Sequence, residues 1–342
     1  GGDGDADVSG GLGGRRGLAA LPPAQVAMQF DAGVAREYLK YFTTNLAAEF
    51  WGGSPTNRGL ERLIDGLSEL SSLNMTTFVD VGAAMYEGPD ICHAGQIAQQ
   101  WAGHPGVRIF AFEPQAALLE QARAFVDRAV GDDAQSIEWI AAAVSNVTTE
   151  ETLLRCGHMR NQATLSTLVD FSTAAPDYRG LGEMGSSLPV PTLTLDRFAV
   201  ERGLDVIDFL KIDTEGHDWE VLKGSEQLLS QNAIHVIVFE LAGQMNPLYY
   251  RLHKERKAVK MRNVRRIPEP TLWSITKWLD RRDYDVFLLG HDVFVPLTGD
   301  WWYDAYEACM QSQPPCWYDA VAISRRAGPW VPDLLRRFPL PA

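Results

Sequence analysis

The stretch DFLKIDTEG at residues 208–216 decides the fold of this chain. Its apolar residues predict a short buried strand over residues 206–212, and the polar run 213–216 is typical of a turn that ends such a strand. A helical pattern follows from about His217 to Leu229. A strand that leads directly into a helix indicates an α/β unit.

Similar units lie on both sides of this stretch. A helical pattern covers residues 115–130, and short apolar runs predict further strands at 78–81, 108–112, 137–144 and 234–239. This alternation predicts a mostly parallel sheet with helices on both faces. A helix near residues 272–280 and β-prone segments at 285–289 and 319–324 favour a late hairpin-like pair that closes the sheet.

The regions outside the alternating pattern are expected to be simpler. Residues 1–24 are rich in Gly and Asp and predict a disordered leader, whereas apolar spacing at 34–50 and 60–70 predicts two amphipathic helices. We therefore expect four segments: the leader, a helical extension at 25–74, a main domain at 75–330 with an insertion at 243–270, and a tail at 331–342.

Composition narrows the class of protein. The chain has 342 residues, of which 46% are hydrophobic and 22% charged, as is usual for soluble globular proteins. A net charge of -13 argues against nucleic acid and anionic membrane surfaces as partners, and no apolar run approaches the roughly 20 residues of a membrane-spanning helix. The sequence leaves the oligomeric state unknown.

The cysteines and the glycosylation motifs leave the compartment open. The four cysteines form no CxxC motif, and whether Cys309 and Cys316 form a disulfide stays undecided. Two glycosylation sequons, at Asn74 and Asn146, keep the secretory lumen as an alternative to a default cytoplasmic location.

Acidic residues stand at the ends of the predicted strands. In open α/β sheets, ligands bind beyond the carboxyl ends of the strands. Clustered carboxylates repel one another unless a cationic or hydroxyl-rich group binds between them. This pattern indicates a ligand site formed by Asp80, Glu113, Asp213 and Glu240.

The turn after the first strand, DVGAAMYEGP at residues 80–89, indicates which ligand. A dinucleotide needs a glycine-rich turn for its pyrophosphate, but Ala84 and Tyr86 add bulk and Glu87 would repel phosphate. S-adenosylmethionine fits better because it carries a sulfonium, an ammonium and a ribose diol but no phosphate.

Three residues have expected contacts with this donor. Gly82 would let the backbone approach it closely, and Asp80 would anchor the loop or face its ammonium. Glu113 would accept the ribose hydroxyls, although Glu113-Pro114 is also typical of a turn that merely ends a strand.

These residues resemble the FkbM family of methyltransferases over roughly residues 75–325. The resemblance implies a Rossmann-like class I methyltransferase with a seven-stranded sheet, S-adenosylmethionine as donor, and O-methylation of a sugar, glycan or natural-product hydroxyl. The family usually has glycine where Tyr86 stands, so we expect a reshaped donor loop with glycine at Gly88. The matching segments are 78–83, 112–114, 143–145, 193–196, 208–224 and 239–240. The implied donor-binding residues are Asp80, Gly82, Ala83, Tyr86, Glu113, Pro114, Val144, Ser145 and Asp213.

The catalytic candidates follow the fourth strand. Lys211, Asp213 and Glu215 are alternate residues and are therefore expected to face the same side of the strand and its exit turn. Asp213 is our first choice for a general base or acceptor-positioning group. The alternative is that Asp213 caps the next helix. Lys211 is expected to pair with a neighbouring acid. His217 is either a base or a solvent-facing residue.

Glu240 has two expected roles. It would bind acceptor hydroxyls or join Asp213 around a divalent ion. Such carboxylates would suit magnesium or calcium. No ligand spacing specifies a metal, so none is predicted.

A basic run at residues 251–266 contrasts with the acidic chain. A solvated loop is one interpretation, and a lid over an anionic acceptor is the other. N-methylation and a non-catalytic binding or scaffold module remain alternatives to O-methylation.

Overall fold

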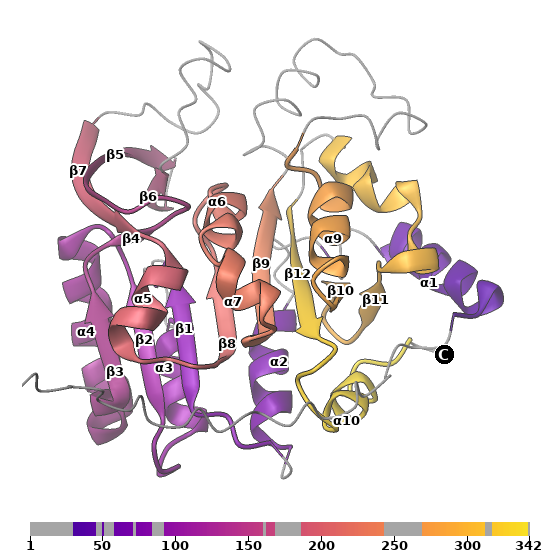
Figure 1. Ribbon diagram of the computed structural model, residues 1–342, viewed down its shortest axis with the longest axis horizontal. Helices are drawn as coiled ribbons and strands as arrows, with labels where there is room; N and C mark the ends of the chain where they lie inside the picture. The colour runs from indigo at the N-terminus through magenta and orange to yellow at the C-terminus, as the bar shows by residue number, and fades with distance from the viewer. Residues whose placement is uncertain are drawn as a thin grey trace, which may run out of the picture.

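A computed structural model describes residues 30–45, 50, 58–70, 73–83, 92–159, 162–167, 186–242, 269–311 and 317–340. Within these ranges the chain forms a large central sheet with helices on both faces and a smaller second sheet at one edge (Figure 1). The predicted mixed α/β architecture is therefore confirmed. None of the described helices has the length and apolar character needed to cross a membrane.

The central sheet has the strand order β11-β10-β12-β9-β8-β1-β2-β3. Neighbours from β9 to β3 run parallel, whereas β12 runs antiparallel between β9 and β10. The strands are β1 (Thr77–Val81), β2 (Arg108–Phe112), β3 (Ile137–Ile140), β8 (Ile207–Ile212), β9 (Ile234–Ala242), β10 (Tyr284–Leu289), β11 (Phe294–Pro296) and β12 (Trp317–Ser324).

The late antiparallel pair agrees with the sequence-based expectation, but the strand count differs. The described sheet has eight strands instead of seven. The extra strand is β11, which turns back after Gly290 and pairs with β10 through Leu289 and Phe294. Three residues are too short a run for a sequence pattern to reveal.

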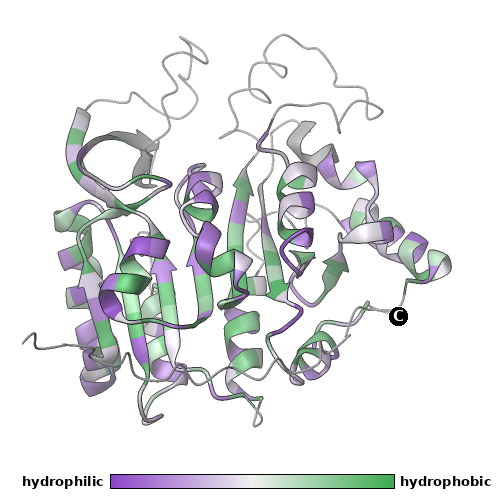
Figure 2. Ribbon diagram, viewed as in Figure 1, coloured by the Kyte–Doolittle hydropathy of each residue, from purple (hydrophilic) through white to green (hydrophobic). Residues whose placement is uncertain are grey.

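Helices cover the two faces of the central sheet in separate groups (Figure 1). Apolar strand residues pack against both groups, so the sheet is buried on both sides, and Figure 2 shows its strands as largely hydrophobic. One face carries α2 (Gly59–Ser68), α3 (His93–Gln100), α4 (Ala116–Val130) and α10 (Val331–Leu335). The other carries α1 (Ala32–Asn45), α5 (Leu195–Arg202), α6 (Asp218–Lys223), α7 (Glu226–Ser230) and α9 (Leu272–Asp280).

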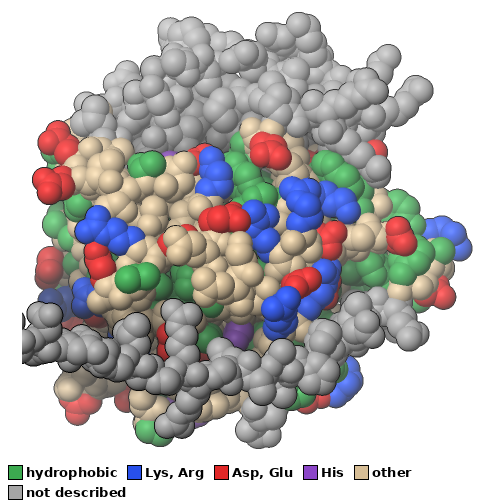
Figure 3. All heavy atoms as spheres, in the orientation of Figure 1, with side chains coloured by type: hydrophobic (Ala, Val, Ile, Leu, Met, Phe, Trp, Pro, Cys, Tyr) green, Lys and Arg blue, Asp and Glu red, His purple; other side chains and the backbone are tan. Residues whose placement is uncertain are grey.

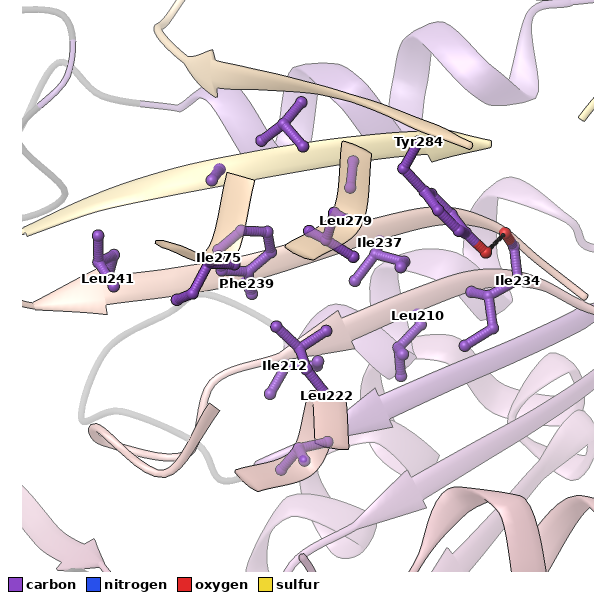
Figure 4. Close-up of a cluster of buried hydrophobic side chains, with 14 of the residues drawn as sticks. Leu210, Ile212, Leu222, Ile234, Ile237, Phe239, Leu241, Ile275, Leu279 and Tyr284 are labelled. Atoms are coloured by element: carbon purple, nitrogen blue, oxygen red, sulfur yellow. Dashed lines mark hydrogen bonds between the residues drawn. The ribbon is translucent and has the colours of Figure 1, made fainter. Parts of the chain in front are cut away.

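Strand parity assigns each side chain to one of these faces. Figure 4 shows Leu210 and Ile212 of β8 and Phe239 and Leu241 of β9 in the apolar cluster beside α6 and α9. The alternate residue Phe209 belongs to the opposite core, with α2 and α3. Because successive residues of a strand face opposite sides, Lys211 and Glu240 point toward the α2 and α3 face.

The second sheet corrects the expectation for the third strand. Residues 137–144 do not form one strand: β3 ends at Ile140, the amide of Ala142 bonds back to the Ile140 carbonyl, and the chain leaves the central sheet. The order of the second sheet is β4-β7-β5-β6. Its strands are β4 (Ala143–Val144), β5 (Thr149–Met159), β6 (Gln162–Thr167) and β7 (Ser186–Leu193).

The helix predicted over 217–229 is also divided. It forms α6 and α7, with a break at Gly224 and Ser225. A Cβ at Gly224 would lie 2.0 Å from the Ser145 carbonyl oxygen, so the break is where the second sheet packs closely.

The described N-terminal helices lie within the region predicted at 25–74. The described part of the first helix is Ala32–Asn45, and residues 46–49 of its predicted range lie outside the described part of the chain. Phe42 of this helix packs edge-on against Tyr306, with ring centroids 5.1 Å apart. The predicted tail at 331–342 contains α10 and the buried Phe338, so its described part packs onto the core.

Candidate functional site

A buried ion-pair triad lies between the adjacent strands β1 and β8. Lys211 Nζ is 3.3 Å from Asp80 Oδ1 and 3.3 Å from Asp213 Oδ2, and it donates a 3.2 Å hydrogen bond to the Gly82 carbonyl. Burial alone would lower the pKa of Lys211, but the two carboxylates outweigh it and raise that pKa. Lys211 therefore stays charged and holds the two strand ends together.

Asp80 has a second contact that anchors the next helix. Its Oδ2 accepts a 2.9 Å hydrogen bond from the Ala94 amide in the first turn of α3. A carboxylate at a helix N-terminus is stabilised by the unpaired amides there. The side chain of Asp80 is fully buried, so it supports the site from inside the protein.

Gly82 is fixed by close backbone packing. It has a positive φ of 86°, and a Cβ there would lie 1.9 Å from the Asp213 carbonyl oxygen. The amides of Gly82 and Ala83 both bond to the Phe112 carbonyl, and the Asp213 amide bonds to the Val81 carbonyl. The ends of β1, β2 and β8 are therefore joined into one rigid floor, with the buried Ala83 at its edge. Tyr86 lies outside the described residues.

Glu113 ends β2 as a buried carboxyl group. Its Oε1 accepts a 2.8 Å hydrogen bond from the Gln115 amide, just before α4, with Pro114 half-buried between them. Burial raises the pKa of Glu113 to about 7 despite this bond. Glu113-Pro114 thus forms the strand-ending turn and also places an acid that hydroxyl donors would stabilise.

Two candidate residues from different elements meet in a hydrogen bond. Ser145 Oγ, just after Val144 of β4, lies 2.9 Å from His217 Nε2 at the start of α6. Burial lowers the pKa of His217 to about 4, so the imidazole is neutral at pH 7. His217 thus ties the second sheet to the loop after β8 and does not simply face solvent.

The loop between β8 and α6 is strained. Glu215 has a φ of 55° and Gly216 a φ of 93°, and the left-handed region is unfavourable for a glutamate. Asp218 holds the loop: its Oδ2 accepts hydrogen bonds from the amide and hydroxyl of Thr214 at 3.2 and 2.7 Å. The residue before α6 is His217, so Asp213 does not cap this helix and pairs with Lys211 instead.

Acidic residues of α6, β9 and β12 lie close together beside this loop. Asp218 Oδ1 accepts a 3.0 Å bond from the Glu240 amide, which draws α6 onto the end of β9. Asp319 of β12 stands directly opposite Glu240 in the antiparallel register. Burial, followed by nearby carboxylates, raises the pKa of Glu240 well above its ordinary value.

Sequence reasoning missed Asp218, Asp319 and His93. Asp218 is recognised only when its bonds to Thr214 and Glu240 are seen, and Asp319 only when β12 is placed beside β9. His93 begins α3, and burial, with Lys211 beside it, lowers its pKa to about 4. Its position just after the glycine turn was a signal that the sequence did offer.

The residues in this part of the structure show no arrangement of three or more His, Cys, Asp or Glu side chains suited to a metal, as far as the described ranges reach. The basic run 251–266 lies outside those ranges. Three cations lie over tryptophan rings: Lys223 of α6 over Trp219, Lys277 of α9 over Trp273, and Arg282, just after α9, over Trp278. Each also pairs with an acid. Figure 3 shows basic and acidic side chains mixed over the visible face of the described residues.

The donor set suits a cationic cofactor. Carboxyl groups at the ends of β1, β2 and β8 surround a glycine turn. Among the described residues at this turn, the only basic side chain is Lys211, which is already ion-paired and is therefore not available to bind a phosphate. These acids outnumber the one cation, Lys211, among the described residues at the turn, so they would attract a sulfonium and an ammonium. The residues present therefore fit S-adenosylmethionine.

The sequence of this chain matches one described protein family. A family model described as the methyltransferase FkbM domain matches residues 84–266. No curated protein matches the sequence.

Among solved structures, an O-methyltransferase from Bacillus cereus in complex with SAH is similar at 10% identity and a TM-score of 0.37, over 88% of this chain and 94% of that one. A TehB-like SAM-dependent methyltransferase from Corynebacterium glutamicum has 10% identity and a TM-score of 0.31, over 86% and 100%. Cofactor-bound Rv0187 from MTB has 12% identity and a TM-score of 0.35, over 88% and 93%.

Proposed function

Because this chain belongs to the FkbM methyltransferase family, we propose that it transfers the methyl group of S-adenosylmethionine to a hydroxyl of a sugar, glycan or natural-product acceptor. The family match over residues 84–266 is the observation that carries the proposal. The acidic strand ends support it, since they suit a cationic donor and a hydroxyl-rich acceptor.

The chain's own residues have distinct parts in this proposal. Asp80, Gly82 and Ala83 shape the donor side, Glu113 accepts the ribose hydroxyls, and Val144 and Ser145 border the same pocket. The donor, when bound, supplies an electrophilic methyl group. Lys211 fixes the carboxylate of Asp213 at 3.3 Å, so Asp213 orients the acceptor oxygen. Alignment of the reacting atoms is the main contribution expected of a methyltransferase site.

Calorimetry with S-adenosylmethionine tests the donor half of the proposal. We expect binding by the full chain and unchanged binding by Asp213→Asn, together with a strong loss of turnover. Glu138→Gln, which changes a surface acid paired with Arg202, serves as a matched control with full turnover. Absence of donor binding in the wild type would favour a non-catalytic scaffold.

N-methylation is the second candidate function. The cluster around Asp213, Glu215 and Glu240 also suits an amine acceptor, because its acids would attract the ammonium form and accept the proton that the nitrogen must lose before it attacks the methyl carbon. The two functions differ in where a labelled methyl group is recovered, on oxygen or on nitrogen.

A further inference from the structure

Asp319 and Glu240 stand opposite each other on antiparallel strands near the carboxyl end of β9. Directly opposed residues of such a pair have Cβ atoms about 4.5–5.5 Å apart, and like charges there are destabilising. Two and four residues further along the same face, the chain has the apolar Val238 and Val236 on β9 and Val321 and Ile323 on β12. An acidic pair thus interrupts an otherwise apolar stripe.

The same face carries the donor-side triad. The parallel register pairs Ile212 with Phe239, so one further residue brings Asp213 beside Glu240. Parity places Lys211, two residues before Asp213, on this face as well. The row therefore runs from Asp80 through Lys211 and Asp213 to Glu240 and Asp319, across four neighbouring strands.

Within the described part of the chain, the ion pairs of Lys211 do not extend to Glu240 and Asp319 at the far end of this row. Lys211 already contacts Asp80 and Asp213, so its positive charge is directed to these two carboxyl groups. Among the described residues, the main charged or titratable groups that act on Glu240 and Asp319 are Lys211 of β8, Asp213 and Glu215 of the following loop, Asp218 of α6 and Glu61 of α2. All but Lys211 are acids, which disfavours two ionised carboxylates side by side.

We propose that Glu240 and Asp319 share a single proton and that Glu240, ionised when this proton lies on Asp319, takes up the proton of the acceptor hydroxyl during methyl transfer, with Asp319 as its positioning residue. The inference rests on the proposed function. The acceptor oxygen forms the new bond to the methyl carbon, sulfur leaves with the electron pair of the broken carbon–sulfur bond, and the hydroxyl proton passes to the ionised carboxylate. Asp319 lies beyond the range that the family model matches.

The direction of both pKa shifts agrees with a shared proton. Burial, then Asp213, raises the pKa of Asp319 to about 7, and Glu240 is raised well above its ordinary value. A carboxyl pair of this kind titrates in two coupled steps. A base whose proton affinity is matched to neutral pH is efficient in general-base catalysis.

Carboxyl ¹³C NMR of the full chain tests the pair without any ligand. We expect a Glu240 signal, assigned by its loss in Glu240→Gln, that titrates near or above neutral pH. In Asp319→Asn this titration should move to lower pH by at least about one unit, because the opposing charge is removed. Asp285→Asn is the matched control, because Asp285 lies in the same sheet, opposite Ile323 of β12, but binds Arg325. The proposal that Glu240 and Asp319 share a proton is overturned if the Glu240 titration is unchanged in Asp319→Asn, or if it lies in the ordinary acidic range in the wild type.

A labelled-methyl assay tests the chemical step. Glu240→Gln should lose turnover by about 10²-fold or more, and Asp319→Asn should shift the acid limb of the pH–rate profile to lower pH. Full turnover in Glu240→Gln, or an unshifted profile in Asp319→Asn, overturns the role in proton transfer. A coupled titration without any label transfer from the wild type contradicts the proposed function, whereas label transfer with ordinary titrations contradicts only this inference.

Discussion

At the amino end of the central sheet, Asp208 accepts hydrogen bonds from the Thr76 and Thr77 amides at 2.8 and 3.0 Å and contacts His235 Nδ1 at 3.0 Å. At the carboxyl end, Glu240 and Asp319 face each other among further acids. Burial works to raise the pKa of Asp208, but its hydrogen bonds outweigh burial and lower it, whereas the pKa values of Glu240 and Asp319 are raised.

This contrast separates structural acids from acids available for chemistry. An acid at the amino end stabilises the fold because its charge is fully satisfied. Acids at the carboxyl end reduce stability, and such arrangements are retained mainly where ligands bind. The triad around Lys211 lies between these cases, since its carboxyl groups are ion-paired yet border the site.

The largest expected effect is on the triad. Lys211→Met leaves Asp80 and Asp213 buried without their cation, and breaking such a pair is expected to lower the free energy of unfolding by about 3–5 kcal/mol. Urea unfolding of the full chain measures this loss. Arg123→Met, which breaks an exposed pair with Asp127, should change stability by less than about 1 kcal/mol. Equal losses in the two variants would contradict the structural role of the triad.

Gly82→Ala tests the rigid floor of the site. The added Cβ would meet the Asp213 carbonyl oxygen at 1.9 Å, so the ends of β1 and β8 must separate and donor binding should be lost. Gly103→Ala is a matched control, because Gly103 also has a positive φ, 73°, but no atom within 4 Å of an added Cβ. Gly82→Ala should be the more destabilising by roughly 1–3 kcal/mol. Donor binding retained in Gly82→Ala would contradict the assignment.

Asp208→Asn tests the structural acid at the amino end of the central sheet. Losing the charge-assisted bonds should lower stability by about 1.5–3 kcal/mol near neutral pH, with donor affinity unchanged. The pKa of Asp208 is lower in the folded than in the unfolded chain, so its contribution is present above the unfolded value and is lost as pH falls through the folded value. Unfolding measured from neutral to acidic pH should show the wild type and the variant converging, and a constant difference would argue against this origin.

Asp319→Asn should change the stability of the protein in the opposite direction from Asp208→Asn. A raised folded pKa means that the folded chain binds the proton more tightly than the unfolded chain, so wild-type stability falls as pH rises toward about 7. The variant lacks this penalty. It should melt at a higher temperature than the wild type at pH 8 and at the same temperature near pH 4. A lower melting temperature at pH 8 would place Asp319 with the structural acids.

The smallest expected effect concerns the link between the two sheets. Ser145→Ala removes the 2.9 Å hydrogen bond to His217 and should lower stability by about 1 kcal/mol. Thr43→Ala, which removes an exposed side-chain bond within α1, is the control and should have a smaller effect. If stability falls by the same amount in both variants, the hydrogen bond between Ser145 and His217 makes no specific contribution to stability.

Much of the central sheet could be predicted because its strands are short apolar runs bounded by turn residues. Residues 208–216 show this well: the strand, the turn and the acids were all visible in the sequence. β11 was not predicted, because a three-residue strand has no detectable period. The longer strands β5 and β7 of the second sheet were not predicted either.

The site was predictable only in part, for a similar reason. Asp80, Glu113 and Asp213 directly follow or end their strands, so chain order reveals them. Asp319 becomes a site residue only through the antiparallel register with Glu240, and the Ser145–His217 bond joins residues 72 positions apart. Such contacts depend on tertiary packing, which single-sequence patterns do not report.

The most direct test of the account is mass spectrometry of candidate acceptors after incubation with the wild-type chain and methyl-labelled S-adenosylmethionine. The account predicts that the label is recovered on an oxygen of a hydroxyl-bearing acceptor, and that Asp213→Asn transfers much less of it. Label recovered on nitrogen would contradict the proposed acceptor, and no label on any acceptor despite donor binding would contradict methyl transfer to a hydroxyl as the activity of this site.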